Sequence, residues 1–320
     1  MIGAIELGLL YGVMALGVYL TFRVLNFPDL TVDGSFTTGA AVAAALITSG
    51  QSPVLATLAG GAAGLVAGAV TGLLHTKGRI DGLLAGILTM IALWSINLRI
   101  MGKANVPLLR EDTVMTPLRD SGWMGKTWIA VLVFAVALFL LKLIVDWFLS
   151  TDLGLSIQAT GNNEQMIRSF GVSTDGTKIL TLSLSNGLVA LAGALVAQYQ
   201  GFADISMGVG LILVGLASVI LGQAVLGQRN LFMASLAVLI GSVLYRLIVF
   251  FALSVGLNPN DMRAVTAVLV ILALLLPRWG FLKKLPSFKD RGNRRPGSKD
   301  PAPDLVASAT TGVTVPGAER

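Results

Sequence analysis

Few side chains in this sequence have the types and spacing that catalysis needs. His75 is the only histidine and there is no cysteine, so thiolate metal sites and cysteine nucleophiles are excluded. The sequence also lacks a glycine-rich loop ending in Lys-Ser or Lys-Thr, the pattern that cradles the phosphates of ATP. We therefore expect a protein that is not an enzyme and that binds no cofactor or metal ion of its own.

Polar groups gather instead at breaks in the apolar runs. Asp29 and Asp33 share the short segment 23–34, which Pro28 and Gly34 interrupt. Irregular backbone at membrane depth survives only where it is buried in protein or lines a cavity, and two carboxylates exceed what helix capping needs. We predict that residues 26–35 line a route for solute. The candidates for contact with solute are Asn26, Asp29, Thr31, Asp33, Ser35, Asn97, Ser183, Ser185, Asn186 and Asp204.

Each candidate also has a purely structural explanation. Thr31 or Asp33 would cap the helix after the break, which contributes about 1 kcal/mol. Ser183 and Ser185 would bond to carbonyls of their own helix.

Ionisable residues inside the apolar runs are rare. Lys142 and Asp146 are one helical turn apart, and we interpret them as a pair that reaches toward the membrane interface. Arg246 would pair with Glu6 or Asp261, or would take part in the route. Because carriers driven by protons or sodium place carboxylates in the middle of their spans, the scarcity of such groups argues against an ion-coupled carrier or a channel.

The runs that position these residues predict an all-α polytopic membrane protein. Hydrophobic residues make up 54% of the chain and charged residues 12%, whereas soluble domains carry about 25% charged residues. About 20 apolar residues cross the hydrocarbon core as a helix. We predict eight or nine transmembrane helices. They comprise the runs 3–22, 53–74, 81–100, 127–149, 179–199, 207–226, 231–251 and 263–276, with the shorter run 35–47 crossing only if tilted or broken.

The basic residues predict the orientation of these spans. The tail 279–320 is rich in Lys and Arg, so we place it in the cytoplasm and expect it to be disordered, with residues 1–278 forming the membrane domain. This also explains the net charge of +6 without nucleic-acid binding. Loops 75–79 and 150–178 then face the cytoplasm and the N-terminus faces outward. The loop 102–126 would be external although it contains four basic residues, so its side stays open.

Two repeated patterns accompany the spans. The hexapeptides 27–32 and 202–207 match in residue type except at their second position, and each precedes three more apolar runs, which predicts a 4+4 inverted repeat. Gly60, Gly64, Gly68 and Gly72 form a ridge of small residues along one helix face. We expect this ridge to pack within the chain, with a subunit interface as the alternative.

The segment 161–171 predicts one short cytoplasmic helix between two spans. Asn162 would cap its start and Gly171 would end it in the left-handed conformation. Met166, Ile167 and Phe170 would form an apolar stripe that nothing in the chain is obliged to cover. Such a helix lies on the membrane surface or docks into the groove of a partner.

At this point the residues resemble a known family. The run 158–172, Gln-Ala-Thr-Gly-Asn-Asn-Glu followed by Ser-Phe-Gly-Val, resembles the coupling-loop signature of ABC importer permeases of the branched-chain amino-acid and ribose/nucleoside type. The segments 8–18 and 24–29 are similar to the branched-chain type. The fuller motif 25–36 resembles a subgroup labelled as tryptophan/tyrosine or uncharacterised importer permeases. The resemblance extends from about residue 3 to residue 277.

The resemblance implies a permease that moves a small solute by alternating access across the bacterial inner membrane. Its partners would be a second permease copy, two cytoplasmic ATPase subunits that bind ATP and Mg²⁺, and an external substrate-binding protein. The residues that would contact the ATPase are Gly161, Asn162, Asn163, Glu164, Met166, Ile167, Arg168, Phe170 and Gly171.

The solute and the rival functions stay open. The resemblance implies an amino acid, with aromatic ones among the candidates. Pro28-Asp29 and Asp33 depart from the branched-chain pattern, which argues against transferring the solute of that group directly to this chain. The alternatives are a sugar or nucleoside permease, an ion-coupled carrier or channel, and a membrane scaffold or membrane enzyme.

Overall fold

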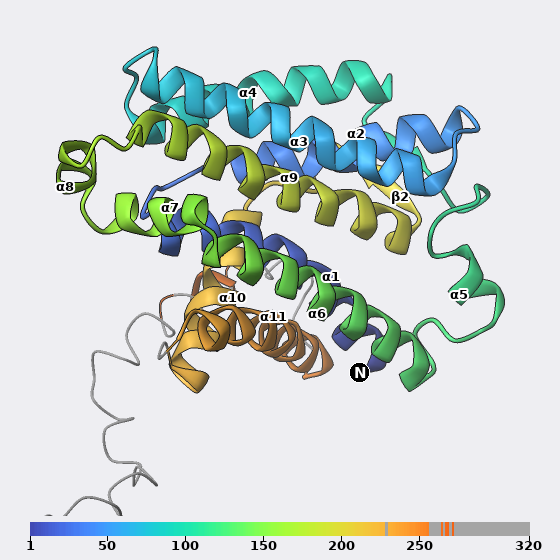
Figure 1. Ribbon diagram of the computed structural model, residues 1–320. Coiled ribbons are helices and arrows are strands. Elements are labelled where there is room, and N and C mark those ends of the chain that lie inside the picture. The colour runs from blue at the N-terminus through green and yellow to red at the C-terminus, as the bar shows by residue number, and fades with distance from the viewer. Residues whose placement is uncertain (228–229, 256–263, 265, 269–270, 272–320) are drawn as a thin grey trace, which may run out of the picture. The chain divides into compact units, whose positions relative to one another are not determined.

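A computed structural model (Figure 1) describes residues 1–227, 230–255, 264, 266–268 and 271. Its described part is almost entirely helical. The helices are α1 (Ile2–Tyr19) with a π-helical extension η1 (Leu20–Val24), α2 (Thr31–Thr48), α3 (Pro53–Thr76), α4 (Gly82–Met101), α5 (Thr116–Asp120), α6 (Trp128–Ser150), α7 (Asp152–Asn162), α8 (Glu164–Ser169), α9 (Thr174–Gln200), α10 (Leu211–Leu226) and α11 (Leu231–Ser254). The strands β1 (Asn105–Pro107) and β2 (Phe202–Asp204) form an antiparallel pair that the sequence did not predict.

Six described helical segments are long and apolar enough to cross a membrane. They are Ile2–Val24, Pro53–Thr76, Gly82–Met101, Trp128–Ser150, Thr174–Gln200 and Leu231–Ser254. The prediction of eight or nine spans is not confirmed. The predicted run 207–226 becomes a helix only at Leu211, because the residues before it form turns, and most of the run 263–276 and all of the tail 279–320 lie outside the described residues.

The connections between the helices gather at two opposite ends (Figure 1). At one end, which we call the α8 end, Phe27 packs edge-on against His75 and the α7–α8 segment lies against the end of η1. At the other end, the β end, Glu6 bonds to Gly125 and strand β1 pairs with β2. The loops 75–79 and 150–178 therefore share one end, and loop 102–126 lies with the N-terminus at the other.

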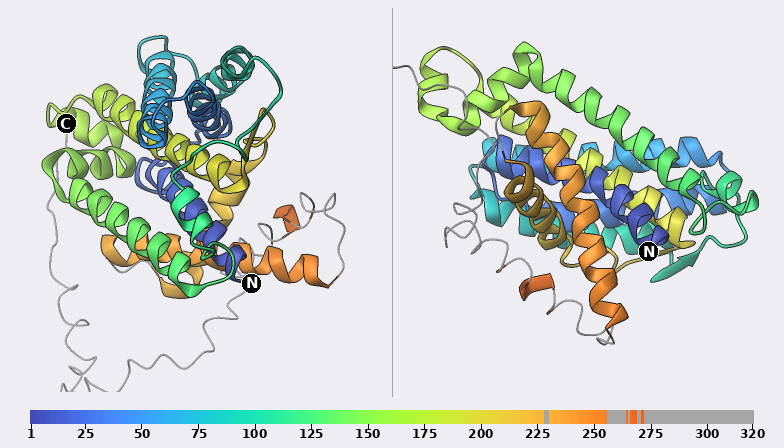
Figure 2. Two further views of the ribbon diagram at one scale, coloured as in Figure 1. Left: turned by 90° about the vertical axis from the view of Figure 1, so that its right-hand side faces the viewer. Right: turned by 90° about the horizontal axis from the view of Figure 1, so that it is seen from below.

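Helices α9 and α1 organise the packing. Helix α9 contacts α1, α2 and α3, while α1 contacts α6, α10 and α11; Figure 2 shows the two groups on either side of this central pair. The glycine ridge of α3 lies against α9: a Cβ on Gly64 or Gly68 would overlap backbone carbonyls of α9. Since small residues let helix backbones approach closely in lipid, this ridge serves packing within the chain, as predicted.

The contacts repeat between the two halves. Helix α2 packs on α3 and α9, and α10 packs on α11 and α1. Asp29 accepts the backbone N–H of Thr31 at 2.9 Å, and Asp204 accepts that of Ser206 at 2.9 Å, so both hexapeptides form the same turn. The inverted repeat stays a prediction, and these are the correspondences that it would produce.

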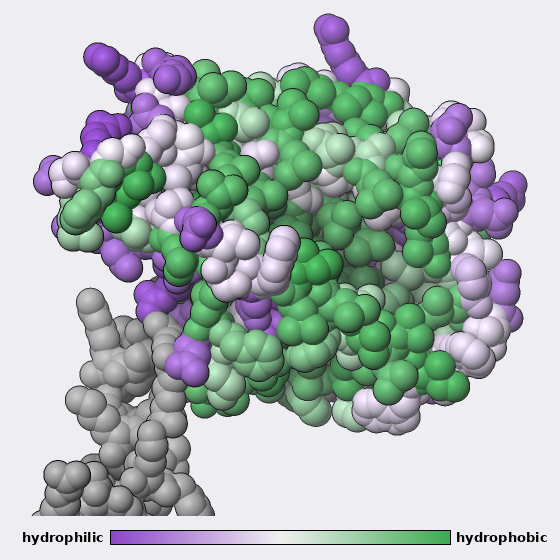
Figure 3. Space-filling view, in the orientation of Figure 1, coloured by the Kyte–Doolittle hydropathy of each residue, from purple (hydrophilic) through white to green (hydrophobic). Residues whose placement is uncertain are grey.

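The outer surface of the bundle is apolar between its ends. Leu58, Leu132 and Trp147 are more than 60% exposed, and Figure 3 shows apolar surface between hydrophilic groups at the α8 end and at the β end. A continuous apolar surface between the two ends of a bundle is stable only in contact with lipid or with another protein. The chain is therefore a multi-pass membrane protein.

Candidate functional site

The predicted cytoplasmic helix is built from two helices. Helix α7 runs through Asn162, Asn163 is extended, and α8 begins at Glu164. The side chain of Asn163 accepts the N–H of Met166 at 3.0 Å, so Asn163 caps α8 rather than Asn162. Asn162 is unsuited to this role because it is the last helical residue of α7, whereas an N-cap has a non-helical backbone. Gly171 follows α8 with φ +84°, in the predicted left-handed conformation.

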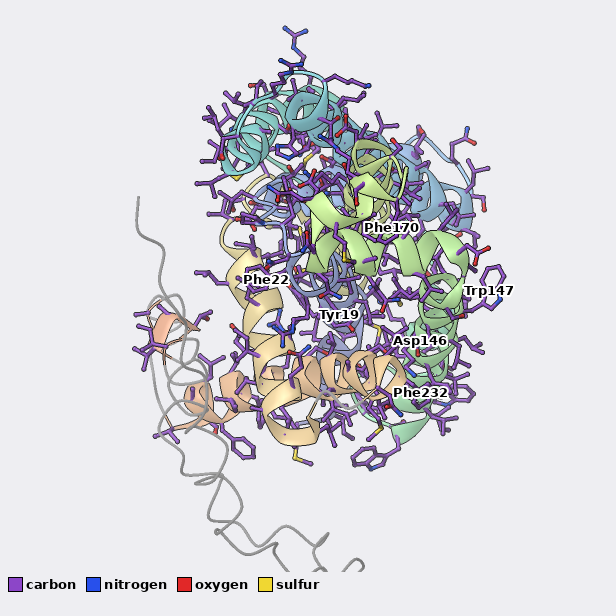
Figure 4. The ribbon with its side chains drawn as sticks, turned by 60° about the vertical axis from the view of Figure 1, so that its left-hand side comes forward. Tyr19, Phe22, Asp146, Trp147, Phe170 and Phe232 are labelled. Atoms are coloured by element: carbon purple, nitrogen blue, oxygen red, sulfur yellow. The ribbon has the colours of Figure 1, made fainter. Side chains whose placement is uncertain are left out.

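Helix α8 presents an apolar surface to solvent. Phe170 is 75% exposed and Met166 is 49% exposed, and Figure 4 shows Phe170 at the tip of this segment. No part of the described chain covers these two side chains. Exposed large apolar groups at the end of a membrane protein form a surface suited to a partner.

Ion pairs fix α8 to the start of α9. Lys178 donates to Glu164 at 2.8 Å, and Arg168 bonds to Asp175 at 3.0 Å. The hydrogen bond and the charge of Lys178 hold the pKa of Glu164 below its ordinary value, although partial burial opposes this. These two ion pairs connect α8 directly to the first turns of α9.

A second contact joins α7 to the broken segment. A Cβ on Gly161 would overlap the carbonyl oxygen of Val24 and would contact Leu25, so only glycine allows this approach. Gln158 donates to the carbonyl of Leu149 at 2.8 Å, which fixes α7 to the end of α6. The α7–α8 segment therefore contacts both the end of η1 and the end of α6.

Three of the candidate route residues form a buried network. Asp29 is 2% exposed and accepts the side-chain amide of Asn186 on α9 at 2.7 Å. Thr31 exchanges a hydrogen bond with Thr71 at 2.8 Å, and Thr71 bonds to Thr89 at 3.0 Å. This network fixes the start of α2 to α3, α4 and α9. Asn26, in contrast, is exposed at the α8 end with φ +56°.

Asp33 connects the two halves of the chain. Its carboxylate accepts the backbone N–H of Gly210 at 2.7 Å and that of Ile212 at 2.8 Å, at the start of α10. Asp33 was predicted to cap its own helix or to line the route. It caps α10 and not its own helix, because the turns 205–210 return this segment to α2; its place on the route stays a prediction. Sequence spacing alone does not reveal a cap that comes from the other half.

Asp33 and Asn97 also line a cavity of about 370 Å³. Its wall also includes Thr37, Trp94, Ser95 and Val209, which are not among the residues predicted from the sequence. The only signal was the presence of polar side chains on the helix 81–100. Asn97 donates to the carbonyl of Gly34 at 3.4 Å, while Ser35 is buried with no partner atom in the described residues.

The remaining candidates have local structural roles. Asp204 lies at the β end beside Asn105, whose amide donates to it at 3.1 Å. Partial burial raises the pKa of Asp204, but hydrogen bonds from Ser206 and Asn105 outweigh this, and the pKa lies below its ordinary value. Ser183 and Ser185 donate to carbonyls of other helices, those of Leu65 and Gly17, and not to their own helix as expected.

The structure corrects two charge assignments. Lys142 pairs with Asp146 at 2.6 Å, but its side chain is fully buried under the ring of Phe232 and does not reach the interface; Figure 4 shows Asp146 and Phe232 at this junction of α6 and α11. Glu6 does not pair with Arg246. It accepts the N–H of Gly125 at 2.9 Å and the hydroxyl of Tyr199 at 2.7 Å.

Comparison with known proteins places this geometry in context. Residues 1–276 match the family model described as "Branched-chain amino acid transport system / permease component". The chain is 43% identical over 264 residues to the tyrosine transport system permease protein of Clostridioides difficile (strain R20291), which covers 82% of this chain and 86% of that protein. It is 33% identical to an uncharacterized protein of Rickettsia prowazekii (strain Madrid E), covering 86% of this chain and 96% of that protein.

A ribose import permease of Escherichia coli (strain K12) is 29% identical, over 82% of this chain and 81% of that protein. No solved structure matches the chain significantly.

Proposed function

We propose, because the chain belongs to the family of branched-chain amino acid transport system permease components, that it imports an amino acid as the membrane-spanning subunit of an ABC transporter. The chain is a permease of this ABC-type family. The observation that carries the choice of solute is the high identity to a tyrosine permease along most of both chains. We infer an amino acid with an aromatic side chain. A sugar is the second candidate, because a ribose permease also matches.

A permease of an ABC transport system works with an ATPase and a solute-binding protein. We infer that two ATPase subunits, each binding ATP and Mg²⁺, receive α8, and that a second copy of this chain completes the membrane part. The exposed Phe170 and Met166 support this role of α8. The α8 end then faces the cytoplasm of a bacterial inner membrane, with the C-terminus on the same side.

The contacts suggest how an ATPase would drive the permease. Closure of the ATPase would push α8, which is fixed to α9 through Glu164 and Lys178. The push would also act through Gly161 on the end of η1. Helix α9 contacts α2, and α1 contacts α10. Helices α2 and α10 are the ones that follow the two broken segments. A small movement at α8 would therefore shift both segments, which is the requirement for alternating access.

Uptake in cells tests this function. Cells that lack the gene for this chain should lose uptake of radiolabelled L-tyrosine, and a plasmid with the wild-type gene should restore it. Restoration of ribose uptake without any effect on amino acids would contradict the proposed solute. A plasmid encoding the Phe170→Glu variant, expressed to the same level, is the matched control. It should not restore uptake, because a charge at position 170 would disrupt the apolar contact proposed between α8 and the ATPase.

A further inference from the structure

Arg246 is a cation deep in a membrane-spanning helix. It lies fifteen residues after the start of α11 at Leu231 and eight before its end at Ser254, which places it about 22 Å along the helix at about 1.5 Å per residue. Its guanidinium carbon is 3.8 Å from the centre of the Tyr11 ring. A cation over an aromatic face is stabilised, but its charge is not neutralised.

The described residues offer Arg246 no counter-ion. No described carboxylate lies within 4.0 Å of its guanidinium, and its Nε is buried without a hydrogen-bond acceptor. Glu6 is occupied by Gly125 and Tyr199. Asp261, the other partner that the sequence suggested, lies outside the described residues. Charged groups at membrane depth are rare and usually pair or serve function.

A cavity of about 380 Å³ opens beside Arg246. This volume falls in the range of about 300–1,000 Å³ in which small-molecule sites usually lie. Its walls include Leu211, Val249 and Leu253, and one side is closed by Tyr245, whose hydroxyl bonds to Thr266 at 2.8 Å. A mostly apolar cavity with one strong polar anchor is the usual form of a site for a small amphipathic ligand.

Arg246 supplies the positive charge that an anion would meet in this cavity. The start of α10, at Gly210 and Leu211, also lines the cavity. The positive partial charge of that helix N-terminus is already compensated, because Asp33 accepts the N–H groups of Gly210 and Ile212. The planar guanidinium matches a carboxylate, which it binds through two parallel hydrogen bonds. An uncharged sugar would leave the cation without a partner.

We propose that Arg246 binds the carboxylate of the transported solute in this cavity, with the solute's apolar side chain against Val249 and Leu253. This inference rests on the proposed function for the class of solute. Val209 lines both this cavity and the cavity at Asp33 and Asn97. The two cavities are therefore adjacent, and Val209 lies between them.

The test measures the reactivity of Arg246 itself. The full-length protein in nanodiscs of zwitterionic lipid is treated with phenylglyoxal, and peptide mass spectrometry follows the modification of each arginine. The probes are L-tyrosine and L-leucine, each compared with its decarboxylated amine, tyramine or 3-methylbutylamine. Both amino acids should slow the modification of Arg246 by about fivefold or more at saturation, because a carboxylate bound through two parallel hydrogen bonds occupies the guanidinium nitrogens that phenylglyoxal attacks. The amines should not. Arg99, which is exposed on α4, is the internal control and should react at one rate throughout.

A second measurement uses variants and radiolabelled L-tyrosine binding. Arg246→Gln should weaken binding about tenfold or more, and Arg246→Lys, which keeps the charge but loses the fork, by less. Should Arg246→Gln not fold, the protection of the wild-type arginine still decides the matter.

Several outcomes would overturn the inference. Equal protection by an amino acid and by its amine would contradict a carboxylate site. An Arg246 that phenylglyoxal never modifies would also contradict the inference, because a site for solute must become accessible. Protection by anionic lipid alone would identify a lipid phosphate instead. If Arg246 is unreactive in the wild type but reacts in the Asp261→Asn variant, Arg246 and Asp261 form a structural ion pair. If these tests fail while ATP-driven uptake persists, the proposed function stands without this site. If uptake proves independent of an ATPase while protection holds, the site stands and the proposed function fails.

Discussion

Replacing Asp33 by alanine removes the contact between α2 and the start of α10. The wild-type carboxylate accepts two backbone N–H groups, from Gly210 at 2.7 Å and from Ile212 at 2.8 Å. Both donors lie at the N-terminus of α10, where N–H groups have no partner within the helix, so the substitution leaves both without their acceptor. Thr37 would still accept the N–H of Gly208 at 3.1 Å, which holds the preceding turn in place.

The magnitude follows from these two bonds. Loss of an N-cap costs about 0.5–2 kcal/mol, and a hydrogen bond to a charged group contributes about 1.5–3 kcal/mol. Because Asp33 is partly exposed and the second contact through Thr37 remains, we expect a loss of about 2–4 kcal/mol. On the scale of about 2–4 °C per kcal/mol for domains of about 150–250 residues, the melting temperature should fall by about 4–16 °C.

Thermal unfolding of the purified protein in detergent measures this effect. Asp33→Asn keeps one acceptor oxygen, so it should lose about half as much stability as Asp33→Ala. Asp112→Ala, in an exposed loop, is the matched control and should melt with the wild type. Equal melting temperatures for wild type and Asp33→Ala would refute the argument that this carboxylate holds the two halves together.

Three further predictions follow from single contacts. Phe170→Ala should abolish co-purification with the ATPase without lowering the melting temperature, whereas Leu109→Ala, equally exposed at the β end, should leave co-purification intact. The pKa of Glu164 lies below its ordinary value, so its pairing stabilises α8 above about pH 4.3 and is lost as the pH falls through the folded pKa. Hydrogen exchange of α8, corrected for intrinsic rates, should therefore accelerate on acidification in the wild type. It should not accelerate in Glu164→Gln. Gly39→Val should yield no folded protein in size-exclusion chromatography, because its Cβ would overlap a backbone carbonyl of α9, while Gly3→Ala, with 3.5 Å to its nearest neighbour, should elute as the wild type.

The helical bundle was predictable because length and hydropathy determine it. Runs of about 20 apolar residues have few alternatives to a helix in lipid, and the spans 53–74 and 231–251 fall within α3 and α11. The glycine ridge was predictable for the same reason, since its four-residue spacing places it on one helix face. The start of α10 was not, because hydropathy does not distinguish the turns 207–210 from a helical turn.

The roles of individual polar residues were harder to predict because they depend on long-range contacts. The Asp33–Gly210 bond spans 177 positions, and the Glu6–Gly125 bond spans 119. Local rules assign such residues to the nearest helix end, as happened with Asp33. Lys142 was placed at the interface because its own helix ends nearby, but the ring of Phe232 on α11 covers it.

The coupling of transport to a separate ATPase is tested most directly in proteoliposomes. Purified permease is reconstituted with its ATPase and binding protein, ATP and Mg²⁺ are supplied on the ATPase side, and accumulation of labelled L-tyrosine is followed. We predict accumulation that requires hydrolysable ATP and all three proteins. Accumulation by vesicles that contain this chain alone, without any ATPase, would contradict the account.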